Sequence, residues 1–323
     1  MKNRDSNIEL LRLLCMAGIV LMHFIGLAVC PGVWNPKVSL SPEIVKGTLI
    51  CSLTILSVNI FGLISGYYGI RFSWKRLFIL YFTCAFYAFI GCMVGHVSNM
   101  ELSTKTLLLE ILLPFSHPSG SGLWYIQCYV GLMMIAPLLN KAIEHLNRKE
   151  YAVILVLFTI VNVYLGRFWK VPTYNVYGYS LSQLVFLYLI GGYIRKNTDI
   201  TKLSYLKIFF PMLVCIILWN ILTLMQHKIM VPHWSPTSYN HLVILIASIC
   251  VFLLFLKHPF VNNAINYVAP GSLAIYLFHQ NGHVWEILQR TLSWCECLSH
   301  GGVIPFSRFL QLVYVCSSSC LTS

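Results

Sequence analysis

An arginine and a histidine interrupt an apolar segment near the start of the chain. Arg12 and His23 are eleven residues apart, and because a helix turns about 100° per residue, this step leaves them only about 20° apart on one face. A rise of about 1.5 Å per residue separates them by roughly 16 Å along the axis. In a membrane helix, Arg12 would then lie near the surface and His23 near mid-depth. Glu9, three residues before Arg12, is adjacent to it on the helix and can orient its guanidinium.

These residue types suit transfer chemistry on a phosphorylated substrate. A guanidinium binds phosphate through two parallel hydrogen bonds and stays charged, whereas a neutral imidazole can take the proton of a hydroxyl group. The alternative is that Arg12 only anchors the helix at the headgroups and His23 only bridges neighbouring helices. Ionisable groups at this depth are expensive, so a functional role is the default hypothesis.

Two further segments bring polar groups into apolar surroundings. The segment Val58 to Tyr68 contains Asn59 and Ser65, candidate residues of a cavity or acceptor site, together with Gly62 and Gly66, whose spacing favours close helix packing. The basic loop that follows is a topology signal or, alternatively, a phosphate site. Its basic residues are Arg71, Lys75 and Arg76.

Aromatic and histidine residues mark the other two segments. Trp124 and Tyr125 begin an apolar stretch, where they belong either to an interfacial aromatic belt or to a site that stacks on sugar rings. Ser272, Tyr276 and His279 are spaced to share one side of a later helix. His279 is either a packing histidine or part of the cavity that His23 lines.

Composition places all of these residues in a membrane protein. Hydrophobic residues make up 58% of the chain and charged residues 10%, and mean hydropathy is +0.74, which leaves too little polar surface for a soluble domain. We predict an all-α integral membrane fold with a single domain over residues 1–323 and about ten transmembrane helices around a central cavity. The predicted spans are 8–30, 44–67, 77–95, 122–139, 151–168, 181–194, 206–225, 240–256, 270–288 and 303–319. Pro and Gly in 122–139 and 181–194 favour broken or re-entrant helices there.

Charge distribution predicts the orientation. Most of the 22 lysine and arginine residues fall in segments that are cytoplasmic when both termini are inside, as the positive-inside rule requires. The net charge of +12 then reflects contact with anionic lipid of the bilayer and predicts no nucleic-acid partner. The cysteines show no metal-ligand spacing, so we expect no metal.

The four segments together resemble membrane acyltransferase family 3, the integral-membrane O-acyltransferases that act on bacterial surface polysaccharides and related acceptors. The resemblance covers nearly the whole chain in the same order. Its elements are Glu9 with Arg12-x10-His23, Phe61-x-x-x-Ser65-Gly66-Tyr67, Leu123-Trp124-Tyr125 to Pro137, and Ile275-Tyr276-Leu277-x-His279.

The resemblance implies a multi-pass protein of the bacterial inner membrane that moves an acyl group, usually acetyl from acetyl-CoA, to a hydroxyl of a glycan or lipid-linked glycan. Carried over to this sequence, His23 is the essential catalytic residue and Arg12 a catalytic and donor-site residue, with Glu9, Arg71, Lys75 and Arg76 as further donor-site candidates. Many members that modify polysaccharides carry Arg-x-x-Arg after the Ser-Gly-Tyr segment, and the spacing of the basic loop departs from that pattern here. The family's usual charged tail after the last helix is also missing, which predicts a shortened last span.

Three functions of different classes follow from these observations. The leading one is an O-acyltransferase, with acetyl as the favoured group and acyl-CoA as the donor. The main alternative is a polytopic transporter or flippase in which the intramembrane Arg12 and His23, with His279, relay protons or anions. The third is a non-catalytic membrane partner in a surface-glycan complex, which a shortened last span would favour.

Overall fold

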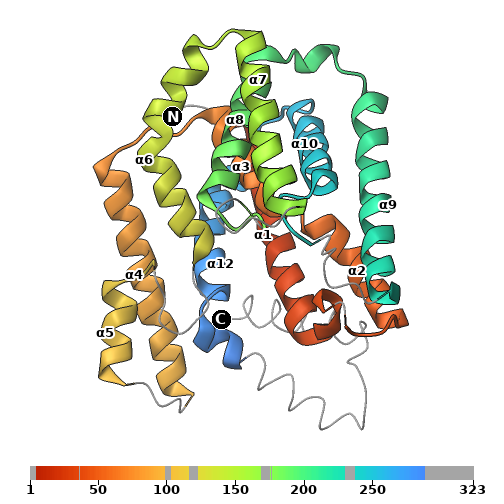
Figure 1. Cartoon of the computed structure of the whole chain (residues 1–323). Helices are drawn as coiled ribbons and strands as arrows, with labels where there is room; N and C mark the ends of the chain where they lie inside the picture. The colour runs from red at the N-terminus through yellow and green to blue at the C-terminus, as the bar shows by residue number, and fades with distance from the viewer. Residues whose placement is uncertain are drawn as a thin grey trace.

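The computed structural model of the chain describes residues 5–35, 37–98, 103–115, 123–168, 175, 177–229 and 237–287. These residues form helices joined by short connections, with no strand in the described part (Figure 1). The prediction of an all-α fold is therefore confirmed for these residues.

The helices are named in chain order, with π-helical and 3-10 segments labelled η. They are α1 (Ser6–Phe24), η1 (Ile25–Val29), η2 (Pro31–Trp34), α2 (Pro42–Thr54), α3 (Ser57–Tyr68), α4 (Trp74–Val97), α5 (Thr104–Leu112), α6 (Trp124–His145), α7 (Arg148–Thr159), η3 (Ile160–Phe168), α8 (Leu181–Asn197), η4 (Ile200–Lys202), α9 (Tyr205–Ile229), α10 (Leu242–Leu256), α11 (Asn263–Val268), η5 (Ala269–Gly271) and α12 (Ser272–His279). Residues 282–287 are again helical.

Among the described residues, six helical stretches are long and apolar enough to cross a membrane. They are Ser6–Phe24, Pro42–Tyr68, Trp74–Val97, Trp124–His145, Arg148–Gly166 and Tyr205–Ile229, and Leu242–Leu256 is a shorter apolar helix. The molecule is therefore built as a multi-pass membrane protein.

The ten predicted spans agree with this structure in position more than in length. Every predicted span except the last coincides with a helix, but the span 44–67 consists of α2 and α3 with a turn at Ile55 and Leu56 between them. The span 270–288 contains α12, which is only 8 residues long. The span 303–319 lies outside the described residues. The number of ten spans and the cytoplasmic termini stay predictions.

The two stretches expected to be broken or re-entrant are continuous helices. α6 runs through Pro137 without ending, and α8 is unbroken over 17 residues. α8 is buried along almost its whole length, so neighbouring helices rather than lipid surround it.

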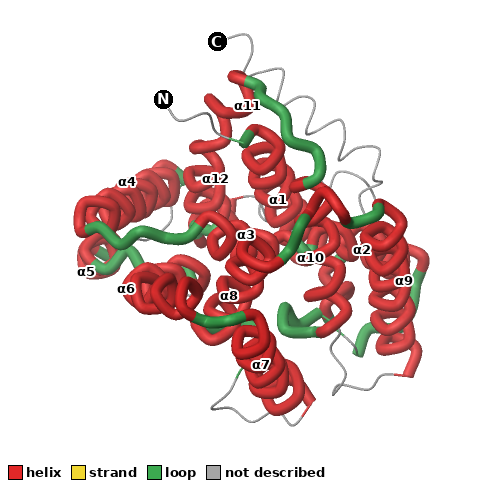
Figure 2. Tube along the Cα trace, turned by 90° about the horizontal axis from the view of Figure 1, so that it is seen from above, coloured by secondary structure: helices red, strands yellow, loops and turns green. Residues whose placement is uncertain are grey.

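The centre of the molecule is the pair α3 and α8, which lie side by side within the other helices (Figures 1 and 2). A Cβ added at Gly66 would lie 2.0 Å from the carbonyl oxygen of Tyr188, and one at Gly191 would lie 2.2 Å from the carbonyl oxygen of Leu63. Glycine is therefore required at both positions, because any side chain would separate the backbones. The prediction that Gly62 and Gly66 serve close packing is confirmed, since Gly62 also faces α8 through Leu187.

The turn after α3 fixes the position of the basic loop. Gly69 adopts a φ of 73°, a left-handed conformation that favours glycine. The hydroxyl of Tyr188 accepts a hydrogen bond from the Ile70 backbone N–H at 2.8 Å and donates one to Asn140 Oδ1 at 2.6 Å. The first residue of the loop, Arg71, is thereby held beside the end of α3.

Two cations at the end of α8 stabilise neighbouring helix ends. Arg195 donates to the carbonyl oxygens of Tyr67 and Tyr68 at 3.1 and 3.2 Å. Lys196 donates to three carbonyl oxygens at the end of α6, among them that of Ile143 at 2.6 Å. Cations at helix C-termini satisfy orphan carbonyls and oppose the helix dipole, so both of these side chains have structural partners.

The first helix changes from α-helical to π-helical geometry just after His23. α1 ends at Phe24 and continues as the π-helical segment η1, in which the Cys30 backbone N–H bonds to the carbonyl oxygen of Ile25 at 2.7 Å. Short π-helical segments inside helices are rare and frequently lie at functional sites. Here the π segment begins two residues after His23.

Candidate active site

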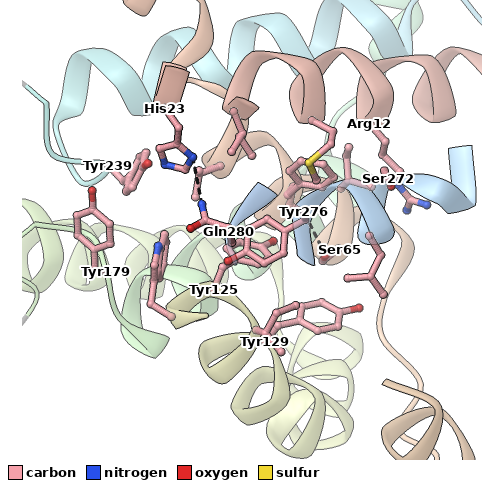
Figure 3. Close-up of a pocket in the computed structure, with 18 of the residues that line it drawn as sticks. Arg12, His23, Ser65, Tyr125, Tyr129, Tyr179, Tyr239, Ser272, Tyr276 and Gln280 are labelled. Atoms are coloured by element: carbon pink, nitrogen blue, oxygen red, sulfur yellow. Dashed lines mark hydrogen bonds between the residues drawn. The ribbon is translucent and has the colours of Figure 1, made fainter. Parts of the chain in front are cut away.

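A cavity of about 290 Å³ lies between α1, α3, α6 and α12. Arg12 and His23 both line it, and Figure 3 shows them at opposite ends. The prediction that the two side chains share one face of the first helix is therefore confirmed. Five residues singled out in the other segments line the same cavity, namely Ser65, Trp124, Tyr125, Ser272 and Tyr276.

The guanidinium of Arg12 is held by the neighbouring carboxylate. Arg12 Nη1 donates to Glu9 Oε1 at 3.2 Å, and the two side chains are 35% and 11% exposed. One edge of the guanidinium is thus engaged, and its remaining N–H groups are available to a ligand in the cavity. The structure confirms the predicted pairing of Glu9 with Arg12.

His23 belongs to a cluster of three side chains. Its Nδ1 lies 3.2 Å from Nε2 of His279 and 3.0 Å from Nε2 of Gln280. The two imidazole rings stack with centroids 5.4 Å apart. The short helix α12 and the residue after it supply both partners, so the position of His23 depends on the end of α12.

The proton on His279 can be assigned from its neighbour. His279 Nδ1 lies 2.9 Å from the carbonyl oxygen of Ile275, and because a carbonyl only accepts, Nδ1 of His279 carries the proton. In the neutral ring, Nε2 of His279 is then an acceptor. An N–H at His23 Nδ1 can donate to it, which leaves the lone pair on His23 Nε2.

Gln280 gives His23 a second arrangement. Its amide nitrogen lies 3.0 Å from His23 Nδ1 and 3.3 Å from His279 Nε2, so it can donate to either ring. When it donates to His23 Nδ1, His23 carries its proton on Nε2 instead. The cluster therefore supports two tautomers of His23, and the one that donates to His279 is the one in which Nε2 can act as a base.

Aromatic rings surround the end of the cavity where His23 lies. Trp124 stacks on Tyr239 with centroids 5.8 Å apart and meets Tyr179 edge-on at 4.7 Å. All three line the cavity, and Figure 3 shows Tyr179 and Tyr239 near His23. No carboxylate lines this cavity among the described residues, so the imidazole of His23 is its strongest base.

A second cavity of about 330 Å³ adjoins the Arg12 end. Arg12 and Ser65 line both cavities, and the second adds Arg71 and Arg76. Arg76 donates to the carbonyl oxygen of Arg71 at 3.2 Å, which holds the two together. Three guanidinium groups thus gather at one end of the combined space, a pattern suited to phosphate.

The predicted residues do not all reach these cavities. Asn59 is completely buried, donates to the carbonyl oxygen of Tyr239 at 2.8 Å and faces Gln183 Nε2 at 3.5 Å, so it holds the Tyr239 loop rather than lining the space. Lys75 is exposed and lines neither cavity. His279 is buried behind His23 and contacts it instead of facing the cavity.

Sequence reasoning missed several lining residues. Gln280 directly follows His279, and its polarity next to a buried histidine was a usable signal. Tyr179 and Tyr239 come from connections between helices, far apart in the chain, and nothing in their spacing marks them.

Comparison with known proteins gives one match. A family model described as an acyltransferase domain matches residues 5–286, which include every residue of the two cavities named above. No curated protein and no solved structure matches the chain.

Proposed function

The chain belongs to the acyltransferase 3 family, and from that premise we propose that it transfers an acyl group, acetyl in the first instance, from acyl-CoA to a hydroxyl of a carbohydrate or related cell-surface acceptor. The observation that supports this best is that the two cavities share lining residues, among them Arg12 and Ser65, with guanidinium groups at one end and an imidazole at the other. A donor with a phosphorylated head and a reactive thioester at the end of a long arm requires this separation of charge and base.

The donor would bind with its phosphates at the basic end. Arg12, Arg71 and Arg76 line the second cavity, and guanidinium groups bind phosphate oxygens in charge-assisted pairs. The pantetheine arm would then extend past Ser65 into the first cavity, since Ser65 lines both. This arrangement brings the thioester toward His23 and assigns Glu9 the task of orienting Arg12.

His23 would act as the general base. Nε2 takes the proton of the acceptor hydroxyl as the hydroxyl oxygen attacks the thioester carbonyl. The tetrahedral intermediate then expels the CoA thiolate, which takes this proton from the His23 imidazolium and leaves as the free thiol. His279 accepts the hydrogen bond from His23 Nδ1 and so selects the basic tautomer. In this scheme His279 is a positioning residue, because it does not line the cavity.

The acceptor would enter at the aromatic end. The rings of Trp124, Tyr179 and Tyr239 offer flat apolar faces beside the base, and pyranose rings present C–H faces that pack on such surfaces. A glycan or lipid-linked glycan fits this chemistry. The protein would work in the bacterial inner membrane, with Arg12 at the cytoplasmic side, where acyl-CoA is present.

Label transfer tests this proposal. Purified protein is given acetyl-CoA labelled in the acetyl group together with glycan acceptor, and both free CoA thiol and labelled glycan are measured. Wild-type protein and His145→Ala, a change in an exposed histidine at the end of α6, should transfer label, whereas His23→Ala should not. Transfer that persists in His23→Ala at wild-type levels of inserted protein would contradict the assignment of the base.

The same experiment addresses the transporter alternative, which the family assignment does not favour. A transporter would move an intact solute and leave the thioester uncleaved. Mass spectrometry of surface glycans from cells with and without the gene would then identify the acceptor, because each modified residue gains the mass of one acyl group.

A further inference from the structure

A second polar cluster lies apart from the cavities, between α4, α5 and the helical segment 282–287 that follows α12. Its members are Cys92, Glu110 and His283, and their donor atoms all lie within 4.8 Å of one another. Cys92 Sγ is 3.0 Å from Glu110 Oε2, and His283 Nε2 is 3.4 Å from the same oxygen. The three residues come from separate segments of the chain and meet only in the folded protein.

The carboxylate in this cluster lacks a full set of partners. Glu110 is 0% exposed, and its second oxygen, Oε1, has no hydrogen-bond partner. No lysine or arginine forms an ion pair with it in the described part of the chain. A buried carboxylate is costly unless a cation or several hydrogen bonds compensate it. Either a proton on His283 or a bound metal ion can supply that positive charge.

We propose that Cys92, Glu110 and His283 bind a divalent transition metal ion, with zinc as the best fit. Thiolate, imidazole and carboxylate are the ligand types that zinc takes in proteins, at about 2.3 Å for sulfur and about 2.0–2.2 Å for nitrogen and oxygen. Tetrahedral angles at such lengths place ligand atoms roughly 3.5 Å apart. The His283–Glu110 separation of 3.4 Å matches this spacing. The Cys92–Glu110 separation of 3.0 Å is that of a thiol hydrogen bond, and it would lengthen by about 0.5 Å when the thiol loses its proton to bind the ion.

The neighbouring backbone is shaped to admit the histidine. A Cβ added at Gly95 of α4 would lie 3.1 Å from the ring of His283, and one at Gly91 would lie 1.9 Å from Asn281 Nδ2. Asn281 Oδ1 in turn accepts from the His283 backbone N–H at 3.0 Å. Two glycines one helical turn apart thus allow Asn281 and the start of the helical segment 282–287 to approach α4 closely enough for His283 to join Cys92.

The metal would tie the end of α12 to α4 and α5. His283 is only three residues beyond Gln280 and four beyond His279, the two residues that contact His23. Loss of the metal would free the segment after α12 and so loosen His279 and Gln280, which contact His23. This consequence for activity rests on the proposed function, but the metal site itself does not.

Sequence spacing predicts no metal here. Cys92 and Glu110 are 18 positions apart, and His283 follows far later, so no short ligand motif exists. The proposal therefore departs from the sequence-based expectation and rests on the folded structure alone.

Metal content of the purified full-length protein tests the proposal. The protein is prepared in detergent without a histidine tag, dialysed against zinc and then against buffer, and its metals are measured by mass spectrometry. Cobalt(II) is then titrated into the metal-free protein, because thiolate ligation gives a charge-transfer absorption and tetrahedral geometry gives intense visible bands. The variants are Cys92→Ser, Glu110→Gln and, as a matched control, Cys84→Ser, which changes another buried cysteine of α4.

Wild-type protein and Cys84→Ser should hold one metal ion per chain and show the cobalt–thiolate absorption. Cys92→Ser should lose that absorption, and Cys92→Ser and Glu110→Gln should each bind metal more than about 100-fold more weakly, beyond the effect of losing an outer-shell partner. If the variants do not fold, the cobalt spectrum of the wild type decides by itself. Wild-type protein that retains no metal and gives no thiolate absorption, or folded variants that bind as tightly as wild type, would overturn the proposal.

Discussion

Two clusters each contain a histidine from the segment after the start of α12, His279 in one and His283 in the other, and they differ in their access to ligands and in their charge. The cluster of His23, His279 and Gln280 borders a cavity and contains only groups that are neutral in their ordinary tautomers. The cluster of Cys92, Glu110 and His283 is buried, borders neither described cavity and contains a carboxylate and a thiol. The His23 cluster is accessible to a ligand, whereas the Glu110 cluster contains a buried carboxylate without a lysine or arginine partner in the described structure.

The difference shows how one short segment can serve two tasks. An imidazole beside an open cavity can exchange its proton with a substrate, because each tautomer of His23 has a partner for Nδ1. The imidazole of His283 is buried beside a carboxylate, away from both cavities, and is suited to hold a cation rather than to act on a substrate. Residues 279–283 connect the two clusters. A ligand bound at Cys92, Glu110 and His283 (the closed cluster) would therefore fix the geometry of His23, His279 and Gln280 (the open cluster).

The largest expected effect is the loss of acyl transfer in His23→Ala, which we compare with the loss of metal in His283→Ala. His23→Ala should lower kcat/KM for acyl transfer by about 10³-fold, within the range for loss of a general base, and leave metal content unchanged. His283→Ala should abolish metal binding and lower thermal stability more than it lowers acyl transfer. Label transfer, metal analysis and a thermal melt on both variants check this. Equal loss of metal in His23→Ala would show that the clusters are not separate.

A second, smaller effect concerns the basic end of the cavity. Arg12→Ala should raise KM for acyl-CoA by about 10–100-fold, because truncating a charged hydrogen-bond partner costs about 1.5–3 kcal/mol, while kcat for bound donor falls less. Arg12→Lys should recover part of the affinity, since it keeps the charge but not the paired geometry. Initial rates over a range of acyl-CoA concentrations give both constants. An unchanged KM in Arg12→Ala would remove the donor role.

Metal removal is expected to act on stability before activity. At a free metal concentration about 100 times Kd, a bound ion stabilises the fold by about 2.7 kcal/mol, so chelation should lower the melting midpoint by roughly 5 °C. Zinc should restore it, and Cys84→Ser should respond like wild type. A midpoint that chelator does not move in wild-type protein would argue that the closed cluster is a hydrogen-bonded group without an ion.

The sequence identified the open cluster far better than the closed one. Arg12 and His23 are on one continuous helix, so the helical period alone placed them on a common face. Ser272 and Tyr276 reached the cavity for the same reason. Cys92, Glu110 and His283 come from three segments, and only the packing of those segments, which one sequence does not reveal, brings them together.

Helical geometry also explains why one predicted residue misses the cavity. Asn59 and Ser65 are six positions apart, so they point about 120° apart around α3 and cannot both face the same space. Ser65 lines the cavity, and Asn59 instead holds the carbonyl of Tyr239. The prediction assigned Asn59 and Ser65 to the same cavity, although their angular positions on the helix already place them on different faces.

The smallest expected effect compares two glutamates. Glu9 has a cation beside it, the 35% exposed Arg12, and ion pairs of such exposure contribute only about 0.5 kcal/mol, so Glu9→Gln should raise KM for acyl-CoA by about 2-fold and leave the melting midpoint unchanged. Glu110 has no lysine or arginine partner in the described structure, so Glu110→Gln should instead change metal content and the midpoint. Kinetics and melts on the two variants side by side check this. A stability loss in Glu9→Gln as large as that in Glu110→Gln would contradict this distinction between the two carboxylates.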